Sequence, residues 1–440
     1  MSDSIMRAIV LAVVLAALAA TFAGQMNTGL QPAPLTFVPF GRGLPASGQW
    51  REGFRIADMN GDGHRDIVHG AQRKLAGGPV IFLGDGMGSW SSWKAAHFPA
   101  LPYDYGDVEV ADFNRDGHLD VAVAVHYRGI VVLTGDGRGE FSNCSEGLEF
   151  EKNGAPAFTS RAIRATDWNG DGFPDLVAVW EGPRMGGRGT QTANGVFVFL
   201  NKGLNKSAKG WRKIEPALSP AIFSDSLALG DFDGDGHKDI ATGSMVVGRN
   251  DLVNMWRPGT AAPLAVDIPG PNHYVHAVAA GDFDHDGRDD LAVAYVSLEN
   301  EVWYSVLDVY FARAGGKWER RNLSRNPNRN VAVALATGHL RSRRTLDLVA
   351  LSITGETIVY LGDAQGNLTP ASGNIPQYDH GCRGAHVELA DLDGDGHDEI
   401  VAAFADEPRT DGCTSGGGIT AWKVGRELDR NGEANEARSH

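Results

Sequence analysis

The sequence has few cysteines, a deficit of positive charge and, after its first 23 residues, no apolar run of membrane-spanning length. Three cysteines in 440 residues are too few for a disulfide-built scaffold. Forty Lys and Arg against 55 Asp and Glu leave a net charge of −15, which argues against nucleic-acid binding because that requires a basic surface. A membrane helix needs about 20 apolar residues, so no membrane span is expected in the mature chain.

The N-terminus has the pattern of a targeting segment. Arg7 precedes an uncharged apolar stretch, Ala8 to Ala23, that ends in small residues. This order is typical of a cleaved secretory signal, predicted over 1–23 and followed by a linker over 24–34. An uncleaved anchor is the alternative. We therefore expect a secreted or periplasmic protein, in a compartment where disulfides persist.

Glycine is abundant, with 57 residues, and much of it belongs to a repeat. Each copy has an apolar strand, the acidic loop Asp-x-Asp/Asn-x-Asp-Gly-x-x-Asp/Glu, two more apolar runs separated by a loop, and a strand-like piece after a glycine turn. A degenerate copy at His339 has lost most of its acids and keeps Asp347. Four strands repeated seven times predict an all-β fold, a seven-bladed β-propeller. The six intact loops begin at Asp58, Asp112, Asp167, Asp231, Asp282 and Asp391.

Closure of the ring requires a strand from the other end of the chain. The last copy supplies only three strands, and the segment 35–40 is expected to provide the fourth. Joining the first and last blades in this way removes exposed sheet edges. The propeller is thus predicted over 35–425, with a polar, disordered tail over 426–440.

The acidic loops are predicted to bind calcium between the first and second strands of six blades. Side chains at positions 1, 3 and 5 converge when the chain turns at the glycine of position 6, position 7 offers its carbonyl oxygen, and position 9 returns a carboxylate. These hard oxygen ligands suit Ca²⁺ better than Mg²⁺. An EF-hand is excluded because its position 12 needs a bidentate glutamate, whereas here it lies in an apolar strand. Up to six structural calcium ions are expected.

An ion-free, solvated turn is the alternative, but it would leave three or four carboxylates close together without a counterion. The predicted ligands, with position 7 contributing its backbone, are Asp58, Asn60, Asp62, His64, Asp66, Asp112, Asn114, Asp116, His118, Asp120, Asp167, Asn169, Asp171, Phe173, Asp175, Asp231, Asp233, Asp235, His237, Asp239, Asp282, Asp284, Asp286, Arg288, Asp290, Asp391, Asp393, Asp395, His397 and Glu399.

The face opposite these loops is built from segments before each first strand and loops after each second strand. Aromatic rings and charged donors there suit a sugar or a peptide, although polar loop tips are normal in any propeller. The candidates are Trp50, Arg51, Glu52, His69, Arg73, Tyr103, Asp104, Tyr105, His126, Tyr127, Arg128, Arg161, Trp180, Glu181, Asp225, His273, Tyr274, His276, Glu356, Asp379, His380, Arg383, His386 and Asp411. Cys382 and Cys413 also fall on this face and are expected to form a disulfide, which leaves Cys144 free or buried.

The sequence contains no nucleophile elbow, zinc-protease motif, P-loop or dinucleotide fingerprint, and catalytic residues are not assigned. A polysaccharide lyase is the alternative function, because a histidine or tyrosine base beside a charge neutraliser would suffice. His126, Arg128, His273 and Tyr274 could be recruited to it. A scaffold without a small-ligand pocket is a third class that stays open.

The acidic loops, such as Asp231 to Asp239 and Asp391 to Glu399, resemble those of FG-GAP/VCBS repeats, the calcium-containing blades also seen in the integrin alpha head. The resemblance covers about 35–425. It implies a seven-bladed propeller with calcium at the loop between the first two strands of a blade. Members of this family include adhesion proteins, sugar-binding lectins and some polysaccharide lyases. The resemblance therefore implies a binding or adhesion module with a carbohydrate or protein ligand.

Overall fold

The structure is a computed structural model that describes only part of the chain. In that part the regular elements are all strands, and no helix is long and apolar enough to cross a membrane. The predicted signal (1–23), linker (24–34) and tail (426–440) lie outside the described residues. The described residues are 35–72, 77–150, 158–182, 195–204, 210–214, 222–257, 260–371, 373–378, 381–406 and 412–425.

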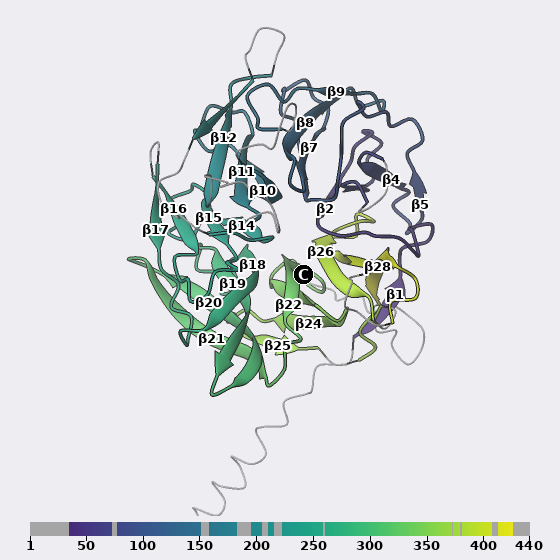
Figure 1. The fold of residues 1–440 in the computed structure, drawn as a ribbon. Coiled ribbons are helices and arrows are strands. Elements are labelled where there is room, and N and C mark those ends of the chain that lie inside the picture. The colour runs from purple at the N-terminus through teal and green to yellow at the C-terminus, as the bar shows by residue number, and fades with distance from the viewer. Residues whose placement is uncertain are drawn as a thin grey trace, which may run out of the picture.

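The strands form seven four-stranded antiparallel sheets arranged as blades around a central axis (Figure 1). This confirms the predicted seven-bladed β-propeller. Blades one to three consist of β2 (Phe54–Ala57), β3 (Asp66–His69), β4 (Val80–Gly84), β5 (Trp90–Ser92); β6 (Val108–Ala111), β7 (Asp120–Val125), β8 (Gly129–Gly135), β9 (Phe141–Asn143); and β10 (Ser160–Thr166), β11 (Asp175–Trp180), β12 (Val196–Asn201), β13 (Trp211–Ile214).

Blades four to seven follow the same order, and blade five has the longest strands. They consist of β14 (Leu227–Gly230), β15 (Asp239–Thr242), β16 (Val253–Arg257), β17 (Thr260–Leu264); β18 (His273–Gly281), β19 (Asp290–Glu299), β20 (Val302–Arg313), β21 (Lys317–Asn326); β22 (Ala332–Gly338), β23 (Asp347–Ser352), β24 (Thr357–Gly362), β25 (Leu368–Pro370); and β26 (Arg383–Ala390), β27 (Glu399–Ala405), β28 (Gly417–Gly425) with β1 (Thr36–Pro39).

Second strands are apolar without alternation because neighbouring blades cover both faces of each sheet. All six residues of β7 and all six of β11 are buried. Their side chains pack between blades, as where Phe113 and Ile130 of blade two meet Phe199 of blade three. The hydrophobic core is therefore a ring of interfaces between blades, while the first strands surround the axis with partly buried residues.

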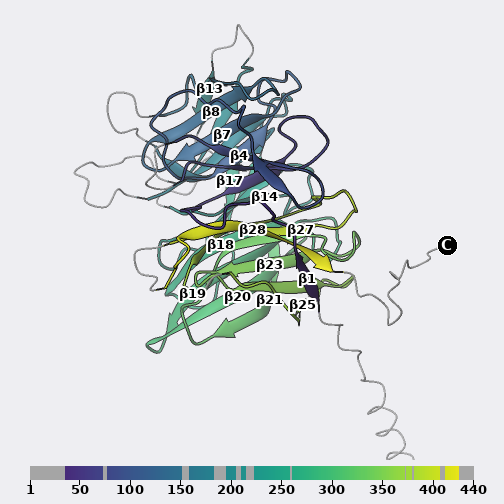
Figure 2. The ribbon, with the colours of Figure 1, turned by 90° about the vertical axis from the view of Figure 1, so that its right-hand side faces the viewer.

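The ring closes where both ends of the propeller meet in blade seven (Figure 2). β1 pairs antiparallel with β28, from Thr36 opposite Gly425 to Pro39 opposite Trp422. This confirms that the N-terminal segment supplies the fourth strand. The pairing of β1 with β28 gives blade seven four strands, as in the other blades, and covers the outer edge of β28.

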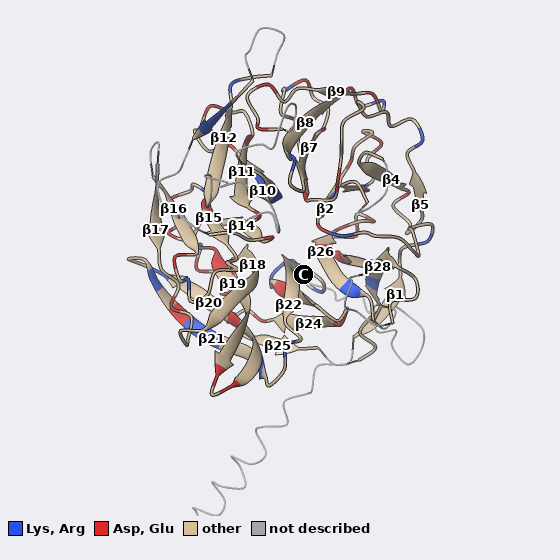
Figure 3. Ribbon diagram, viewed as in Figure 1, with Lys and Arg blue, Asp and Glu red and all other residues tan. Residues whose placement is uncertain are grey.

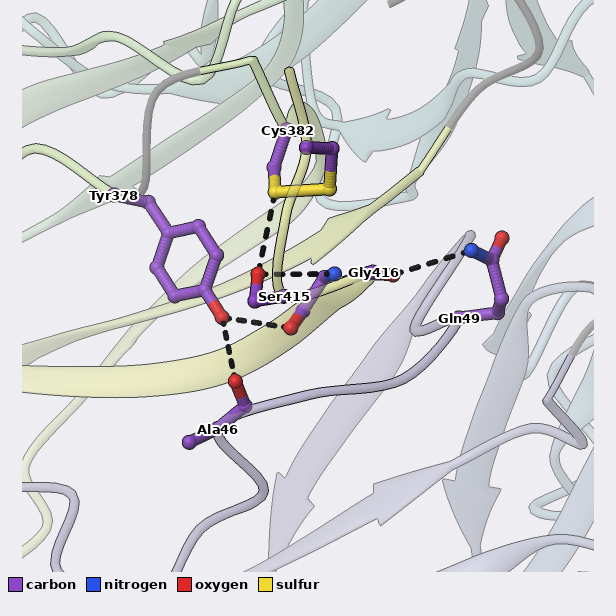
Figure 4. The surroundings of a disulfide bond; sticks show 8 residues. Ala46, Gln49, Tyr378, Cys382, Ser415 and Gly416 are labelled. Carbon is purple, nitrogen blue, oxygen red and sulfur yellow. Dashed lines mark hydrogen bonds between the residues drawn. A yellow bond between two sulfur atoms is a disulfide. The ribbon is translucent and has the colours of Figure 1, made fainter.

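A disulfide joins Cys382 to Cys413 beside this closure, as predicted (Figure 4). Cys382 lies before β26 and Cys413 lies between β27 and β28. The Tyr378 hydroxyl donates to the carbonyl oxygen of Gly417 at 2.7 Å and to that of Ala46 at 3.4 Å. The disulfide and the tyrosine thus hold the loop that meets the N-terminal segment. Cys144, by contrast, is a partly exposed free thiol.

We expect replacement of both Cys382 and Cys413 by serine to lower the free energy of unfolding. The bridge closes a loop of 31 residues, for which the chain-entropy model gives about 3–4 kcal/mol. Urea denaturation of the wild type and the double variant, with and without reductant, measures the difference. Reductant should destabilise only the wild type, and equal stability of the two oxidised proteins would contradict the prediction.

Candidate functional site

Each acidic loop connects the first and second strands of its blade, and strands rather than helices flank it. The position-1 aspartate organises the loop by accepting backbone bonds. Asp58, for example, accepts the N–H groups of Gly61 and Gly63, both at 2.8 Å. The glycine at position 6 has φ between 87° and 90° in all six loops, a conformation that favours glycine because it has no Cβ. The predicted tight turn at the position-6 glycine is therefore present in each loop.

The position-9 acid has a structural role that was not predicted from the sequence. Asp120 is fully buried, and its two carboxylate oxygens accept the N–H groups of Phe113 and Gly135, both at 2.8 Å. It thereby ties the loop to the third strand of its blade. Burial raises the pKa of Asp120 to about 7. Asp347 makes the equivalent bonds in the degenerate copy. Its persistence in a copy that has lost the other acids is the sequence feature that indicates a structural role for position 9.

Three loops bring their acids together. They are the three with aspartate at position 3, and in each the ligand oxygens at positions 1, 3 and 9 lie within 4.8 Å of one another: Asp231, Asp233, Asp239; Asp282, Asp284, Asp290; and Asp391, Asp393, Glu399. Two buried oxygens in these clusters, Asp284 Oδ1 and Asp391 Oδ1, have no hydrogen-bond partner among the described residues. A set of carboxylate oxygens fits a hard divalent cation such as Ca²⁺.

The other three loops have asparagine at position 3, and its amide turns toward position 5. Asn60 Nδ2 donates to Asp62 Oδ2 at 2.9 Å, and Asn114 and Asn169 make the same bond in their loops. The position-7 histidines of these loops, His64 and His118, are exposed. Their side chains are therefore not brought among the acids, as expected for a position that offers only its carbonyl.

Basic side chains from third strands reach two of the acid clusters. Lys423 of β28 contacts Asp393, and its Nζ lies 2.9 Å from Asp395. Arg313 of β20 lies 2.7 Å from Asp284. Part of the negative charge is thus balanced by the protein itself. In the degenerate copy Arg341 Nη2 lies 3.9 Å from Asp347 Oδ1, so an arginine stands beside the position-9 acid there.

Charged residues lie on the inner strands around the axis of the propeller (Figure 3), and the network that they form was not predicted from the sequence. Arg55 of β2 lies 2.8 Å from Glu388 of β26, 3.2 Å from Glu109 of β6 and 3.4 Å from Asp107. Arg164 of β10 lies 2.6 Å from Asp107. Burial raises the pKa of the Asp107 carboxyl, but Arg55 and Arg164 reverse that effect and hold the pKa below its usual value. The sequence feature that could have predicted this network is the presence of charged residues within otherwise apolar first strands.

A second network lies nearer the face opposite the acidic loops and is centred on Arg161. Its guanidinium binds both carboxylate oxygens of Asp225, at 2.5 and 2.7 Å, and lies 3.2 Å from Glu52 and 3.3 Å from Glu181. His126 Nδ1 lies 2.5 Å from Glu181. Burial raises the pKa of Glu52, but Arg161 and Arg51 outweigh it and lower the pKa to about 2. This network unites Glu52, His126, Arg161, Glu181 and Asp225 from the predicted face.

Two of these loop positions have strained backbones. Glu52 has φ of 71° and Tyr127, whose N–H donates to Glu181 at 2.7 Å, has φ of 54°. Such conformations cost about 1–3 kcal/mol in residues other than glycine and cluster at functional sites. Glu52 lines two adjoining cavities of about 50 and 40 Å³, which also share Asp225, Val333 and Ala385.

Three other candidates, predicted on the face opposite the acidic loops, are buried instead. His273 is buried, with Nδ1 2.7 Å from the carbonyl oxygen of Gly270 and Nε2 3.1 Å from that of Arg249. Trp50 and His69 pack in the core of blade one. These three are therefore structural residues rather than surface groups. Four further candidates, Arg73, Asp379, His380 and Asp411, lie outside the described residues.

We expect His69 to make the protein less stable in mild acid. The ring is fully buried, and burial lowers its pKa from 6.5 to about 4. A depressed histidine pKa means that the unfolded chain binds the proton more readily, so stability is lost as pH falls from 6.5 toward 4. Between pH 7 and 5 the loss should be about 2 kcal/mol. Urea denaturation at both pH values should show a smaller loss for His69→Phe, and equal losses would contradict this assignment.

The chain belongs to the FG-GAP-like repeat family. The family model matches residues 58–123, 113–178, 167–242 and 344–402, and the FG-GAP repeat matches 274–295. Human integrin alpha-7 is 28% identical over 134 residues, which cover 28% of this chain and 11% of that protein. Integrin alpha-PS5 of Drosophila melanogaster is 28% identical over 255 residues, 53% of this chain and 24% of that protein. The chain thus matches about a tenth to a quarter of the length of these integrins.

Solved structures show the same fold at low identity. The BP39L lectin from Burkholderia pseudomallei superposes with a TM-score of 0.51 and 16% identity, covering 88% of this chain and 97% of the lectin. BBS1N, solved in complex with ARL6DN, gives a TM-score of 0.50 and 13% identity, covering 90% and 97%. These similarities show the propeller architecture alone.

Proposed function

We propose that this protein is a secreted binding module that takes a carbohydrate or protein ligand on the face opposite the acidic loops. The convergence of Arg51, Glu52, Tyr105, Arg161 and Asp225 at the axis carries the proposal. The guanidinium of Arg51 lies 4.9 Å from the ring centre of Tyr105 and its Nε donates to Glu52 at 2.8 Å. Polar groups from several blades around small cavities are typical of a ligand site.

The acidic loops are proposed to hold structural calcium. In the three clustered loops the acids at positions 1, 3 and 9 would hold the ion, and in the other three Asn60, Asn114 and Asn169 would contribute amide oxygens. A bound cation would screen the carboxylates from one another and stiffen the hairpins that carry them. Secretion is supported by the signal-like sequence of residues 1–23 and by the disulfide of blade seven.

Binding can be tested on a glycan array and on a panel of immobilised extracellular matrix proteins in millimolar calcium. Arg51→Gln should weaken any captured ligand because Arg51 lines the cavity at the axis. Arg138→Gln is the matched control, since Arg138 is exposed in a turn on the acidic-loop side. Absence of binding to both panels, or equal weakening by the two variants, would count against the proposal.

A polysaccharide lyase is the second candidate, and the contact between His126 and Glu181 favours it. Glu181 orients the imidazole, and Arg128 follows His126 by two residues as the candidate charge neutraliser. In such a reaction the base removes the proton next to a uronate carboxylate and the glycosidic C–O bond breaks. Incubation with uronic-acid polymers would then produce ultraviolet absorbance from an unsaturated product, and His126→Ala should abolish it.

A further inference from the structure

A lysine stands in blade seven at a place where the other blades have uncharged residues. Lys423 of β28 follows Trp422, which pairs with Ile400, the second residue of β27. The residues at the same place in the other blades are Leu83, Thr134, Leu200, Met255, Phe311 and Leu361. Most of these side chains are buried, so a lysine at this place requires a partner for its charge.

The acids of the blade-seven loop provide that partner. The Lys423 ammonium contacts Asp393 and lies 2.9 Å from Asp395 and 3.7 Å from Glu399. The Lys423 side chain is 26% exposed and that of Glu399 is 1% exposed, so little water screens these charges from one another. Asp391 Oδ1 in the same loop is buried and has no hydrogen-bond partner among the described residues. The lysine thus balances part of the charge of the loop and leaves one carboxylate oxygen without a partner.

We infer that Lys423 is a tethered cation that competes with the divalent ion for the acids of the blade-seven loop. This inference rests on the proposed calcium sites and concerns the affinity of one of them. Asp393 and Glu399 belong to the cluster that would hold the ion, and the ammonium contacts both. A divalent ion must therefore displace the ammonium or bind against its repulsion. Because like charges a few ångströms apart repel strongly, removal of Lys423 should tighten calcium binding to this loop about tenfold or more.

The strand that carries Lys423 also closes the ring. Lys423 lies opposite Val38 where β28 pairs with β1. Without a cation, the four acids of this loop would repel one another in the blade that joins both ends of the propeller. The lysine offsets that repulsion when no divalent ion is bound. The closing blade should therefore depend less on calcium than it would with an uncharged residue at this place.

Equilibrium dialysis of the full-length protein tests the inference by counting bound ions as free calcium rises. Lys423→Leu is the informative variant, because leucine occupies the same place in three other blades as Leu83, Leu200 and Leu361. One ion should bind at about tenfold lower free calcium than in the wild type. Adding Asp391→Asn to this variant should abolish binding of that ion, which assigns it to blade seven. Lys423→Gln serves if the leucine variant does not fold.

Lys213→Leu is the matched control. The Lys213 side chain is 25% exposed and its Nζ lies 2.6 Å from Glu149, so its burial and pairing resemble those of Lys423, but its partner is not a predicted ligand. Both variants should melt below the wild type in the absence of divalent ions. Added calcium should raise the melting temperature of Lys423→Leu by more than that of the wild type, and that of Lys213→Leu by the same amount as the wild type.

The remaining outcomes separate this inference from the calcium sites on which it rests. Unchanged calcium affinities in Lys423→Leu would overturn the inference and leave the calcium sites in place. Weaker binding of the blade-seven ion in Lys423→Leu would also overturn it, because the lysine would then position the acids for the ion. No calcium binding by the wild type or the variants would refute the proposed calcium sites and the inference together.

Discussion

Removal of divalent cations is expected to lower the free energy of unfolding by about 8 kcal/mol. Extracellular calcium modules bind with Kd of about 0.1–1 mM. At about 1 mM calcium and a Kd near 0.1 mM, each loop adds about 1.4 kcal/mol to the folded state, and six loops add about 8 kcal/mol. Thermal unfolding before and after chelation, followed by return of calcium or magnesium, measures the effect and its selectivity.

Two substitutions make that experiment specific to the loops. Asp112→Asn removes a position-1 acid whose oxygens accept the N–H groups of Asp116 and Gly117, and it should reduce the calcium stoichiometry by one. Asp85→Asn changes an acid in the β4–β5 turn of blade one and should leave the stoichiometry unchanged. A melting temperature that does not respond to chelation would refute structural calcium, whatever the two variants show.

Replacement of Arg55 by methionine is expected to destabilise the protein by about 3–5 kcal/mol, because it leaves buried carboxylates without their cation. The Arg55 side chain is 11% exposed and lies between Asp107, Glu109 and Glu388. Burial raises the pKa of Glu109 even though Arg55 lowers it. In the variant this carboxyl should take up a proton more readily, so part of the lost stability should return at lower pH.

Urea denaturation of Arg55→Met measures this cost, with Arg325→Met as the matched control. The Arg325–Glu299 pair has both side chains 37% exposed, and exposed pairs contribute about 0–1 kcal/mol. Adding Glu388→Gln to Arg55→Met should recover stability because it removes one of the unpaired charges. A loss as small as that of the control would show that the axial network does not stabilise the ring.

Local patterns were enough to predict the blades and their loops. Second strands such as β7 are apolar at nearly every position, which already indicates burial on both faces. The glycine at position 6 and the first aspartate form the loop by contacts within a few residues, as between Asp58 and Gly63. Counting strands in the last repeat was sufficient to predict that β1 completes blade seven.

The sequence by itself therefore determined the repeat, the strand order, the ring closure and the acidic loops, because each depends on neighbours along the chain or on counting copies. Only the tertiary structure decided which charged side chains meet at the axis. Arg55 and Glu388 are 333 positions apart in sequence and 2.8 Å apart in space, since closure brings the first strands of blades one and seven side by side. The contacts of Lys423 with Asp393 and of Arg329 with Trp303 lie within one blade, but they too join different strands or loops. Such contacts depend on side-chain positions across strands and blades, and no local period in the sequence encodes them.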